Sequence, residues 1–298
     1  MRNSYIRFII GVFCLSGFNS CEIYNPAEPI PAYIHIDKIT VVKNPAGFSN
    51  STYPDEGSLS SKISDAWVYI DEQLIGCFEL PTSIPVLYSG SHQVKIRAGI
   101  KVNGIAATRS PYPFYQEYTQ NINFIKGGKT YLSPTVMYRS NTTFKYMENF
   151  ENPGTILRRS GASGVDTSIQ RLFSPNPNVF PDGTGSGIAY LTPQRTYFEC
   201  VLESTPLPQG SAPVFLEFNY KCNHEFVTGV YGLSNSSTLQ VEALTFNPSA
   251  SWNKAYLYLS PAIGQSGNST QFSVFIGMRN FNSEDSLALV LDNIKLVY

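Results

Sequence analysis

The sequence contains few charged side chains and no long helical pattern. Charged residues make up 14% of the 298 positions, against roughly 25% in ordinary soluble domains, and 21 Lys and Arg nearly balance 22 Asp and Glu. Because there is no basic field to collect phosphates, we expect no nucleic acid partner. No apolar pattern at helical spacing extends beyond about two turns, which argues against a helical bundle.

The residue combinations that most enzymes use are also missing. The three histidines are His35, His92 and His224, and His224 lacks the second histidine of a helical zinc-protease motif. No nucleophile elbow and no Cys-x-x-Cys pair occurs. Glu217 and Glu242 are both expected to point away from the core and would serve a glycosidase only if they faced each other in a cleft. We therefore expect no enzymatic activity, and a jelly-roll glycosidase is the least favoured alternative.

Cysteine is scarce, with five positions in the whole chain. Cys14 lies within the first twenty residues and Cys21 directly follows them. The other three, Cys77, Cys200 and Cys222, allow at most one disulfide, which excludes a disulfide-rich scaffold. Cys200 and Cys222 lie in two strand-like runs, where a disulfide across a sheet and two buried free thiols both remain open.

What the sequence does contain favours strands and turns. It has 19 Tyr, 19 Phe, 22 Gly and 20 Pro, and 42% of its residues are hydrophobic. Short alternating runs separated by glycine and proline predict an all-β protein. The length suits two domains. We expect a small antiparallel β-sandwich over residues 32–145 and a jelly-roll sandwich over residues 146–298.

The first 31 residues carry the features of a targeting segment and a tether. Arg2 and Arg7 precede the apolar run "FIIGVFCLSGF", which is too short for an ordinary transmembrane helix. Ser20 before Cys21 resembles the cleavage site of a Bacteroidota lipoprotein, which implies a signal peptide over residues 1–20 and a lipid on Cys21. The alternative is a plain secretory signal that leaves Cys21 free. Residues 21–31 form a proline-rich spacer.

The N-terminal half resembles the PEGA-type and immunoglobulin-like modules of bacterial envelope proteins. The stretch "VYIDEQLIGCFELPTSIPVLYSGSHQVKIRAGI" carries the resemblance. Its landmarks are a hairpin glycine, a turn proline and a returning strand, at Gly76, Pro81, Gly90, His92 and Val94. The resemblance implies an architecture and no chemistry.

The C-terminal half resembles the jelly-roll folds of carbohydrate-binding modules. The opening "NFE", the stretch "WNKAYLYLS" and the closing "LDNIKLVY" carry this resemblance. In such modules an acidic residue near the first strand and an aspartate of the last strand often share a structural calcium ion. Glu151 and Asp292 occupy the matching positions, and carboxylate oxygens suit calcium. The alternative is that Asp292 accepts a hydrogen bond from a turn.

Two candidate contact surfaces follow from the strand patterns. If Leu216 and Phe218 face the core, polar and aromatic side chains on neighbouring strands face outward, a mixture that suits sugars and protein interfaces alike. The residues expected on this binding face are Glu217, Asn219, Lys221, Gln240, Glu242, Tyr256, Tyr258, Phe275 and Arg279. The second surface is the loop with Tyr112, Phe114 and Tyr115, expected either as an exposed contact or as packing between the domains.

Taken together, "PAYIHIDKI", "LIGCFELP", "YPFY" and "LDNIKLVY" resemble one family of uncharacterised Bacteroidota outer-membrane lipoproteins. The resemblance implies a lipid-anchored protein of the outer membrane. Glu22 and Glu28 favour the cell surface over the periplasmic face. We expect a scaffold or docking subunit that works with an outer-membrane β-barrel or another envelope protein. The alternative is a surface glycan-binding lipoprotein.

Overall fold

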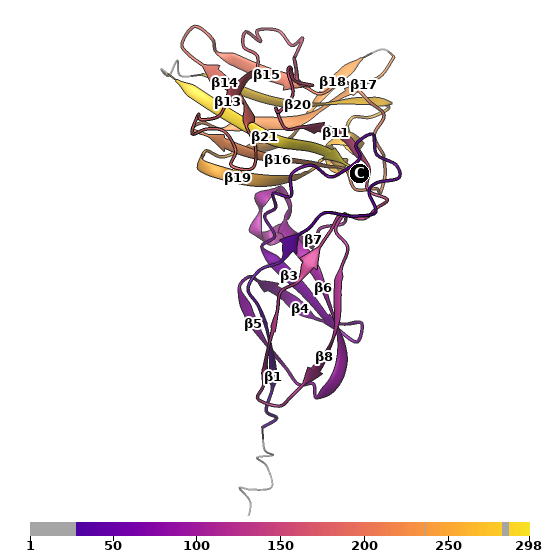
Figure 1. The fold of residues 1–298 in the computed structure, drawn as a ribbon. Coiled ribbons are helices and arrows are strands. Elements are labelled where there is room, and N and C mark those ends of the chain that lie inside the picture. The colour runs from indigo at the N-terminus through magenta and orange to yellow at the C-terminus, as the bar shows by residue number, and fades with distance from the viewer. Residues whose placement is uncertain (1–27, 236, 282–285) are drawn as a thin grey trace, which may run out of the picture.

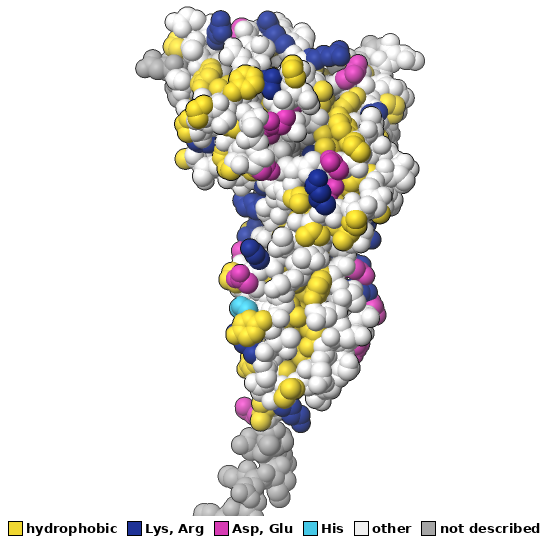
Figure 2. Space-filling model, in the orientation of Figure 1, with side chains coloured by type: hydrophobic (Ala, Val, Ile, Leu, Met, Phe, Trp, Pro, Cys, Tyr) yellow, Lys and Arg dark blue, Asp and Glu magenta, His cyan; other side chains and the backbone are white. Residues whose placement is uncertain are grey.

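The computed structural model describes residues 28–235, 237–281 and 286–298, and its regular structure is nearly all β-strand (Figure 1). The all-β prediction is therefore confirmed. Two sandwiches follow one another along an elongated molecule, which Figure 2 shows in space-filling form. In the described part of the chain, no helix is long and apolar enough to cross a membrane. The expected signal peptide and Cys21 lie outside the described residues.

The N-terminal sandwich has two layers of strands. One layer contains β4 (Gln73–Glu79), β3 (Asp65–Ile70), β6 (Gly90–Lys101), β7 (Arg109–Pro111) and β8 (Tyr118–Phe124). The other contains β5 (Thr82–Val86), β1 (Ala32–Ile36) and β9 (Lys129–Leu132), together with the pair β2 (Thr40–Val41) and β10 (Thr135–Val136). Alternation decides the orientation of the strands, because Ile34 and Ile36 of β1 are buried while Tyr33 is exposed. Two 3₁₀ turns, η2 (Val102–Gly104) and η3 (Ala106–Thr108), follow β6.

The C-terminal sandwich also has two sheets. The first, which we call the docked sheet, contains β13 (Gln170–Phe173), β14 (Gly185–Leu191), β21 (Leu287–Val297), β16 (Phe215–Cys222), β19 (Ser249–Tyr258) and β11 (Phe144–Glu148). The second, the free sheet, contains β12 (Arg158–Arg159), β15 (Tyr197–Val201), β20 (Gln271–Arg279), β17 (Phe226–Leu233) and β18 (Thr238–Phe246). A short helix, α2 (Ser260–Gln265), follows β19.

The core of the C-terminal sandwich lies between its two sheets. Phe218 of the docked sheet and Phe198 of the free sheet are fully buried there. Cys200 and Cys222 are buried free thiols, so the sheets are not joined by a disulfide between them. Burial raises the pKa of Cys222, which keeps it in the thiol form.

Aromatic side chains join the two sandwiches. Tyr112, Phe114 and Tyr115 are all buried, so of the two expected roles of their loop the structure excludes the exposed contact. The Tyr112 ring lies 5.3 Å from that of Phe215 and 4.9 Å from that of Tyr256, centroid to centroid. Both partners belong to the docked sheet, so this loop packs between the sandwiches. We call this contact the junction.

A buried carboxylate lies at the centre of the junction. Glu217 of β16 is fully buried, and Tyr112 and Tyr138 of the N-terminal sandwich donate hydrogen bonds to it at 2.5 and 2.8 Å. The Lys254 ammonium forms an ion pair with it at 3.1 Å. A second buried lysine, Lys295, donates to the backbone oxygen of Ser58 at 2.6 Å.

The electrostatics of the junction depend on this pairing. Burial by itself would raise the pKa of Glu217, but Lys254, Lys295 and the two tyrosine hydroxyls reverse the effect and hold the pKa below its ordinary value. Burial lowers the pKa of Lys295 to about 8, against the attraction of Glu217. The carboxylate is therefore ionised at neutral pH. Its counter-charges, Lys254 and Lys295, come from the docked sheet, and the N-terminal sandwich adds the tyrosine hydrogen bonds.

Glu217→Ala should destabilise the whole chain by about 3–5 kcal/mol, because it leaves buried Lys254 without its counter-ion. Denaturation in urea, followed by circular dichroism, measures this loss. The control is Glu203→Ala, because the Glu203 side chain is 61% exposed and lies 3.8 Å from Arg158. That control should change stability by less than about 0.5 kcal/mol. Equal effects of the two substitutions would contradict a structural role for Glu217.

Candidate functional site

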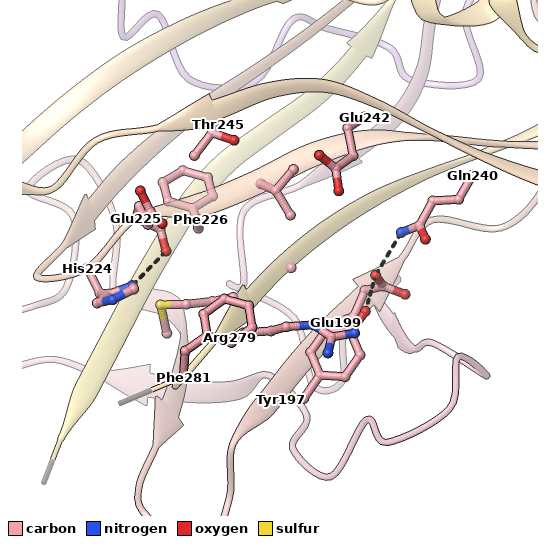
Figure 3. A pocket seen from close by; sticks show the side chains of 13 residues that line it. Tyr197, Glu199, His224, Glu225, Phe226, Gln240, Glu242, Thr245, Arg279 and Phe281 are labelled. Carbon is pink, nitrogen blue, oxygen red and sulfur yellow. Dashed lines mark hydrogen bonds between the residues drawn. The ribbon is translucent and has the colours of Figure 1, made fainter. Parts of the chain in front are cut away.

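The candidate site is a cavity on the outer face of the free sheet, with a volume of about 240 Å³. Strands β15, β20, β17 and β18 supply its floor and walls (Figure 3). Its polar and aromatic lining includes Tyr197, Glu199, His224, Glu225, Gln240, Glu242, Thr245, Arg279 and Phe281. In Figure 3, Glu225 and Glu242 lie on one side of the cavity and Arg279 and Tyr197 on the other.

Strand register explains why the floor is open. Along one row across the sheet, Glu199 of β15 lies opposite Gly277 of β20, which in turn lies opposite Val227 of β17. Phe198 and Cys200 face the core, so Glu199 faces outward. Gly277 carries no side chain, and a Cβ added there would already lie 3.5 Å from the Glu199 Cγ. The glycine therefore leaves the space above the middle strand free for a ligand.

Glu199 is held in place by three donors from the free sheet. Tyr197 and Tyr231 each donate a hydroxyl hydrogen bond to it at 2.7 Å, and the Gln240 amide donates at 3.2 Å. Burial, reinforced by the Glu199 carboxylate, raises the pKa of Tyr231, so its hydroxyl stays protonated. The carboxylate is buried and preorganised, and both of its oxygens already accept protein hydrogen bonds.

Arg279 and two aromatic rings form the lower wall. The Arg279 guanidinium carbon lies 3.7 Å from the centroid of the Tyr197 ring, a cation–π contact. Burial and Glu199 raise the pKa of Tyr197, while Arg279 acts in the opposite direction. Phe281 is 75% exposed at the cavity edge. The cavity thus combines charged hydrogen-bonding groups with an exposed apolar ring.

The expected binding face is divided between the two sheets, which corrects the prediction of one continuous surface. The cavity is lined by Gln240, Glu242 and Arg279. Phe275 is buried, and its ring centroid lies 5.2 Å from that of Tyr231.

The other expected face residues belong to the docked sheet. As predicted, Leu216 and Phe218 face the core, so Glu217, Asn219 and Lys221 point the other way. That outer face is covered: Asn219 donates to Ser60, Lys221 donates to Asn178, and Tyr256 and Tyr258 pack at the junction. Glu217 and Glu242 therefore lie in different sheets, and this pair cannot act across one cleft.

Two central residues of the cavity, Tyr197 and Glu199, were not predicted. Their sequence, "YFECV", alternates outward and inward side chains, which is the only signal that sets them apart. The same alternation in "FLEFNYK" marks Glu217 equally well. Local pattern therefore identifies the outward face of each strand, but does not tell which sheet stays open to solvent.

Glu151 and Asp292 lie near each other and near Asp182. Glu151 accepts hydrogen bonds from the backbone N–H groups of Thr184 and Gly185 at 2.7 and 2.9 Å, and Asp292 accepts from the Ser186 hydroxyl at 2.5 Å. Burial raises the pKa of Asp292 to about 7, opposed by the Ser186 hydrogen bond and assisted by Asp182 and Glu151.

Carboxylate oxygens are the ligands that calcium prefers, so Glu151 and Asp292 fit a divalent cation by their chemistry. The protein's own donors already bind oxygens of both carboxylates. Across residues 28–235, 237–281 and 286–298, no group of three or more His, Cys, Asp and Glu side chains is arranged to hold a metal ion. Structural calcium at Glu151 and Asp292 therefore stays a proposal.

Comparison with known proteins gives a weak likeness to carbohydrate-binding modules. No family model and no curated protein matches the sequence. The family 11 carbohydrate-binding module of Clostridium thermocellum, solved with a β-1,3-1,4-mixed-linked tetrasaccharide, is 16% identical and has a TM-score of 0.36. The match covers 50% of this chain and 93% of that module.

Two further solved structures are similarly distant. The module TmCBM61, solved with β-1,4-galactotriose, is 10% identical over 48% of this chain and 87% of its own, with a TM-score of 0.31. A module from the β-sandwich superfamily, studied for promiscuous specificity, is 11% identical over 91% of this chain and 99% of its own, with a TM-score of 0.38. Sequence identities and TM-scores this low do not establish a shared function.

Asp292→Asn should change how stability depends on pH. The pKa of Asp292 is about 7 in the folded protein and near 3.8 as an ordinary aspartate, so the folded state holds this proton more tightly. Its stabilisation is complete below about pH 4 and is lost as the pH rises to about 7. The substitution should therefore become progressively more favourable between about pH 4 and pH 8, by up to roughly 4 kcal/mol.

Urea titrations at several pH values measure the difference. Asp166→Asn is the matched control, because burial is outweighed there by hydrogen bonds from Thr196 and Tyr197, and the pKa of Asp166 is lowered. That control should stay nearly constant between pH 4 and pH 8 and become more favourable relative to the wild type only below about pH 4. A pH-independent difference for Asp292→Asn would contradict a raised pKa.

Calcium added after EDTA treatment should raise the melting temperature of the wild-type chain and leave Asp292→Asn unchanged. At roughly a hundredfold excess over Kd, the rise should be about 5–10 °C, since a cation that binds only the folded state stabilises it. Differential scanning fluorimetry with magnesium as the comparison ion provides the measurement. Identical melting temperatures with EDTA and with calcium would reject the calcium proposal.

Proposed function

We propose that this protein binds glycans, without catalysis, in the cavity on its free sheet. One observation carries the proposal: the buried, preorganised Glu199 carboxylate forms the floor of an open cavity that also contains Arg279 and the exposed ring of Phe281. This is the alternative function expected from the sequence. A docking subunit is less favoured, because the surfaces expected to dock are buried inside the molecule.

The arrangement of polar and aromatic groups suits a sugar. Hydroxyl groups of a sugar need both donors and acceptors, which Arg279, Gln240 and Glu242 supply around the cavity. The C–H face of a sugar ring can pack on an exposed aromatic ring, here Phe281 at the edge. A cavity of about 240 Å³ has room for one or two sugar rings rather than a long chain.

The same geometry argues against a glycosidase. A catalytic carboxyl must be free to donate a proton or attack the sugar. Glu199 instead accepts hydrogen bonds on both oxygens from Tyr197 and Tyr231, which fix it as an acceptor. Glu217, which the sequence pairs with Glu242 as candidate catalytic carboxylates, is buried at the junction and lies in a different sheet from Glu242.

The features that favoured a docking subunit are used inside the molecule. The aromatic loop with Tyr112 and Phe114 is buried at the junction. The outer face of β16 is covered by the N-terminal sandwich and by the segment around Ser60. Neither is available to an outer-membrane β-barrel.

We infer in addition that the protein is anchored to the outer membrane by a lipid on Cys21, with the cell surface as its location. This inference comes from the sequence around Cys21 and from its resemblance to envelope lipoproteins. A glycan-binding sandwich at the far end of an elongated molecule suits such a tether (Figure 1). Metabolic labelling with a palmitate analogue, compared between wild type and Cys21→Ala, tests the anchor.

Glu199→Gln and Arg279→Ala should each weaken glycan binding at least tenfold, because each removes a charged hydrogen-bonding group from the cavity. A glycan array first identifies an oligosaccharide that the wild-type chain binds, and isothermal titration calorimetry then gives Kd for the variants. The same oligosaccharide should be recovered intact after prolonged incubation.

Glu203→Gln is the matched control for Glu199→Gln, because it makes the same chemical change outside the cavity, where Glu203 is exposed. Its affinity should equal that of the wild type. If the wild-type chain binds no glycan, or if both glutamine variants bind equally well, the cavity is not a glycan site.

A further inference from the structure

Three aliphatic side chains are exposed together at the end of the N-terminal sandwich where the chain enters it. Ile30, Leu87 and Ile125 are 64%, 69% and 68% exposed. Scattered apolar side chains on a surface need no explanation, but a group at one end of a molecule does. We call this group, with the neighbouring Lys126, the tip.

Backbone contacts bring the tip residues together from three separate segments. The Gly127 N–H donates to the Pro31 oxygen at 3.0 Å, and a Cβ added at Gly127 would lie 3.6 Å from the Ile30 Cγ2. The turn after β8 therefore lies against the entering chain. On the other side, Val86 pairs with Ala32, which places Leu87 beside the same entry point.

Cationic and aromatic side chains continue the surface away from the tip. Tyr33 of β1 lies opposite Lys129 of β9 in the parallel register, and both are exposed. Tyr131 is 69% exposed, and the Lys129 ammonium lies 5.0 Å from its ring centroid. In Figure 2, hydrophobic and Lys or Arg side chains are visible at this lower end of the described chain. Aliphatic side chains bordered by tyrosine and lysine are typical of protein surfaces at a lipid headgroup layer.

The short segment between Cys21 and the tip indicates that a lipid bilayer is the partner of this surface. Nine residue steps separate Cys21 from Ile30, so an extended segment spans at most about 30 Å. The apolar run and the cysteine that precede this segment mark the side from which a bilayer would approach. A lysine next to exposed aliphatics is also attracted to anionic headgroups.

We propose that the tip rests on a lipid bilayer, with Ile30, Leu87 and Ile125 inserted among the headgroups. The contact fixes the orientation of the molecule: the N-terminal sandwich stands on the membrane and the C-terminal sandwich, with its cavity, points away from it (Figure 1). This inference goes beyond the proposed glycan binding and does not depend on it, but it rests on the proposed lipid anchor at Cys21, which palmitate labelling tests separately.

Tryptophan quenching by brominated lipids tests the contact in the full chain. The variant Ile125→Trp is reconstituted into phosphatidylcholine vesicles with and without bromine on the acyl chains. The chain has two native tryptophans, Trp67 and Trp252, so the new one contributes one of three. Full quenching at the tip should remove about a third of the emission, since interfacial side chains reach about 5–10 Å into the headgroup and acyl boundary.

Leu239→Trp is the matched control, because Leu239 is also an exposed leucine-sized side chain, 47% exposed, but lies on β18 of the C-terminal sandwich. Bromine should quench no larger a fraction of its emission than it quenches in the wild-type chain in the same vesicles. The proposal is overturned if Ile125→Trp is quenched no more than Leu239→Trp. That result would also follow if a protein rather than lipid covered the tip. Glycan affinity, measured on the same samples, reports the proposed function separately.

Discussion

The buried charge of Glu217 constrains the rest of the molecule. Removing a carboxylate from water costs several kcal/mol unless it is paired and hydrogen-bonded. Its compensation comes from both halves of the chain: Lys254 from the docked sheet, and Tyr112 and Tyr138 from the N-terminal sandwich. Neither half supplies all of it. Because apolar packing around Phe215 continues across the same contact, the two sandwiches share one core at the junction and hold one relative orientation.

This docking decides which face of the C-terminal sandwich can meet a ligand. A β-sandwich has two outer faces, and both sheets here carry polar and aromatic residues on theirs. The N-terminal sandwich covers one of them through the junction and the segment around Ser60. The outer face of the free sheet keeps an open cavity, where Gly277 leaves space and Glu199 is fixed by its tyrosine donors.

The tip, the junction and the cavity follow one another along the axis of the molecule (Figure 1). A rigid junction transmits an orientation set at the tip to the far sandwich. If the tip rests on a bilayer as proposed, the cavity is held away from that bilayer, on the side where a glycan ligand would be accessible. If the junction were flexible, an inserted tip would not fix the orientation of the C-terminal sandwich, because that sandwich could turn freely.

The sequence by itself determined the strands and their faces, since alternation along a strand is a local property. It correctly gave Leu216 and Phe218 to the core and Glu217 to the opposite face. Only the tertiary structure decided that Glu217 is covered by the other sandwich while Glu199, in an equivalent local pattern and buried by neighbours in its own sheet, lines a cavity. The physical reason is that exposure of an outward side chain depends on what packs against the sheet, and here the cover comes from residues more than a hundred positions away along the chain, such as Tyr112 against Glu217.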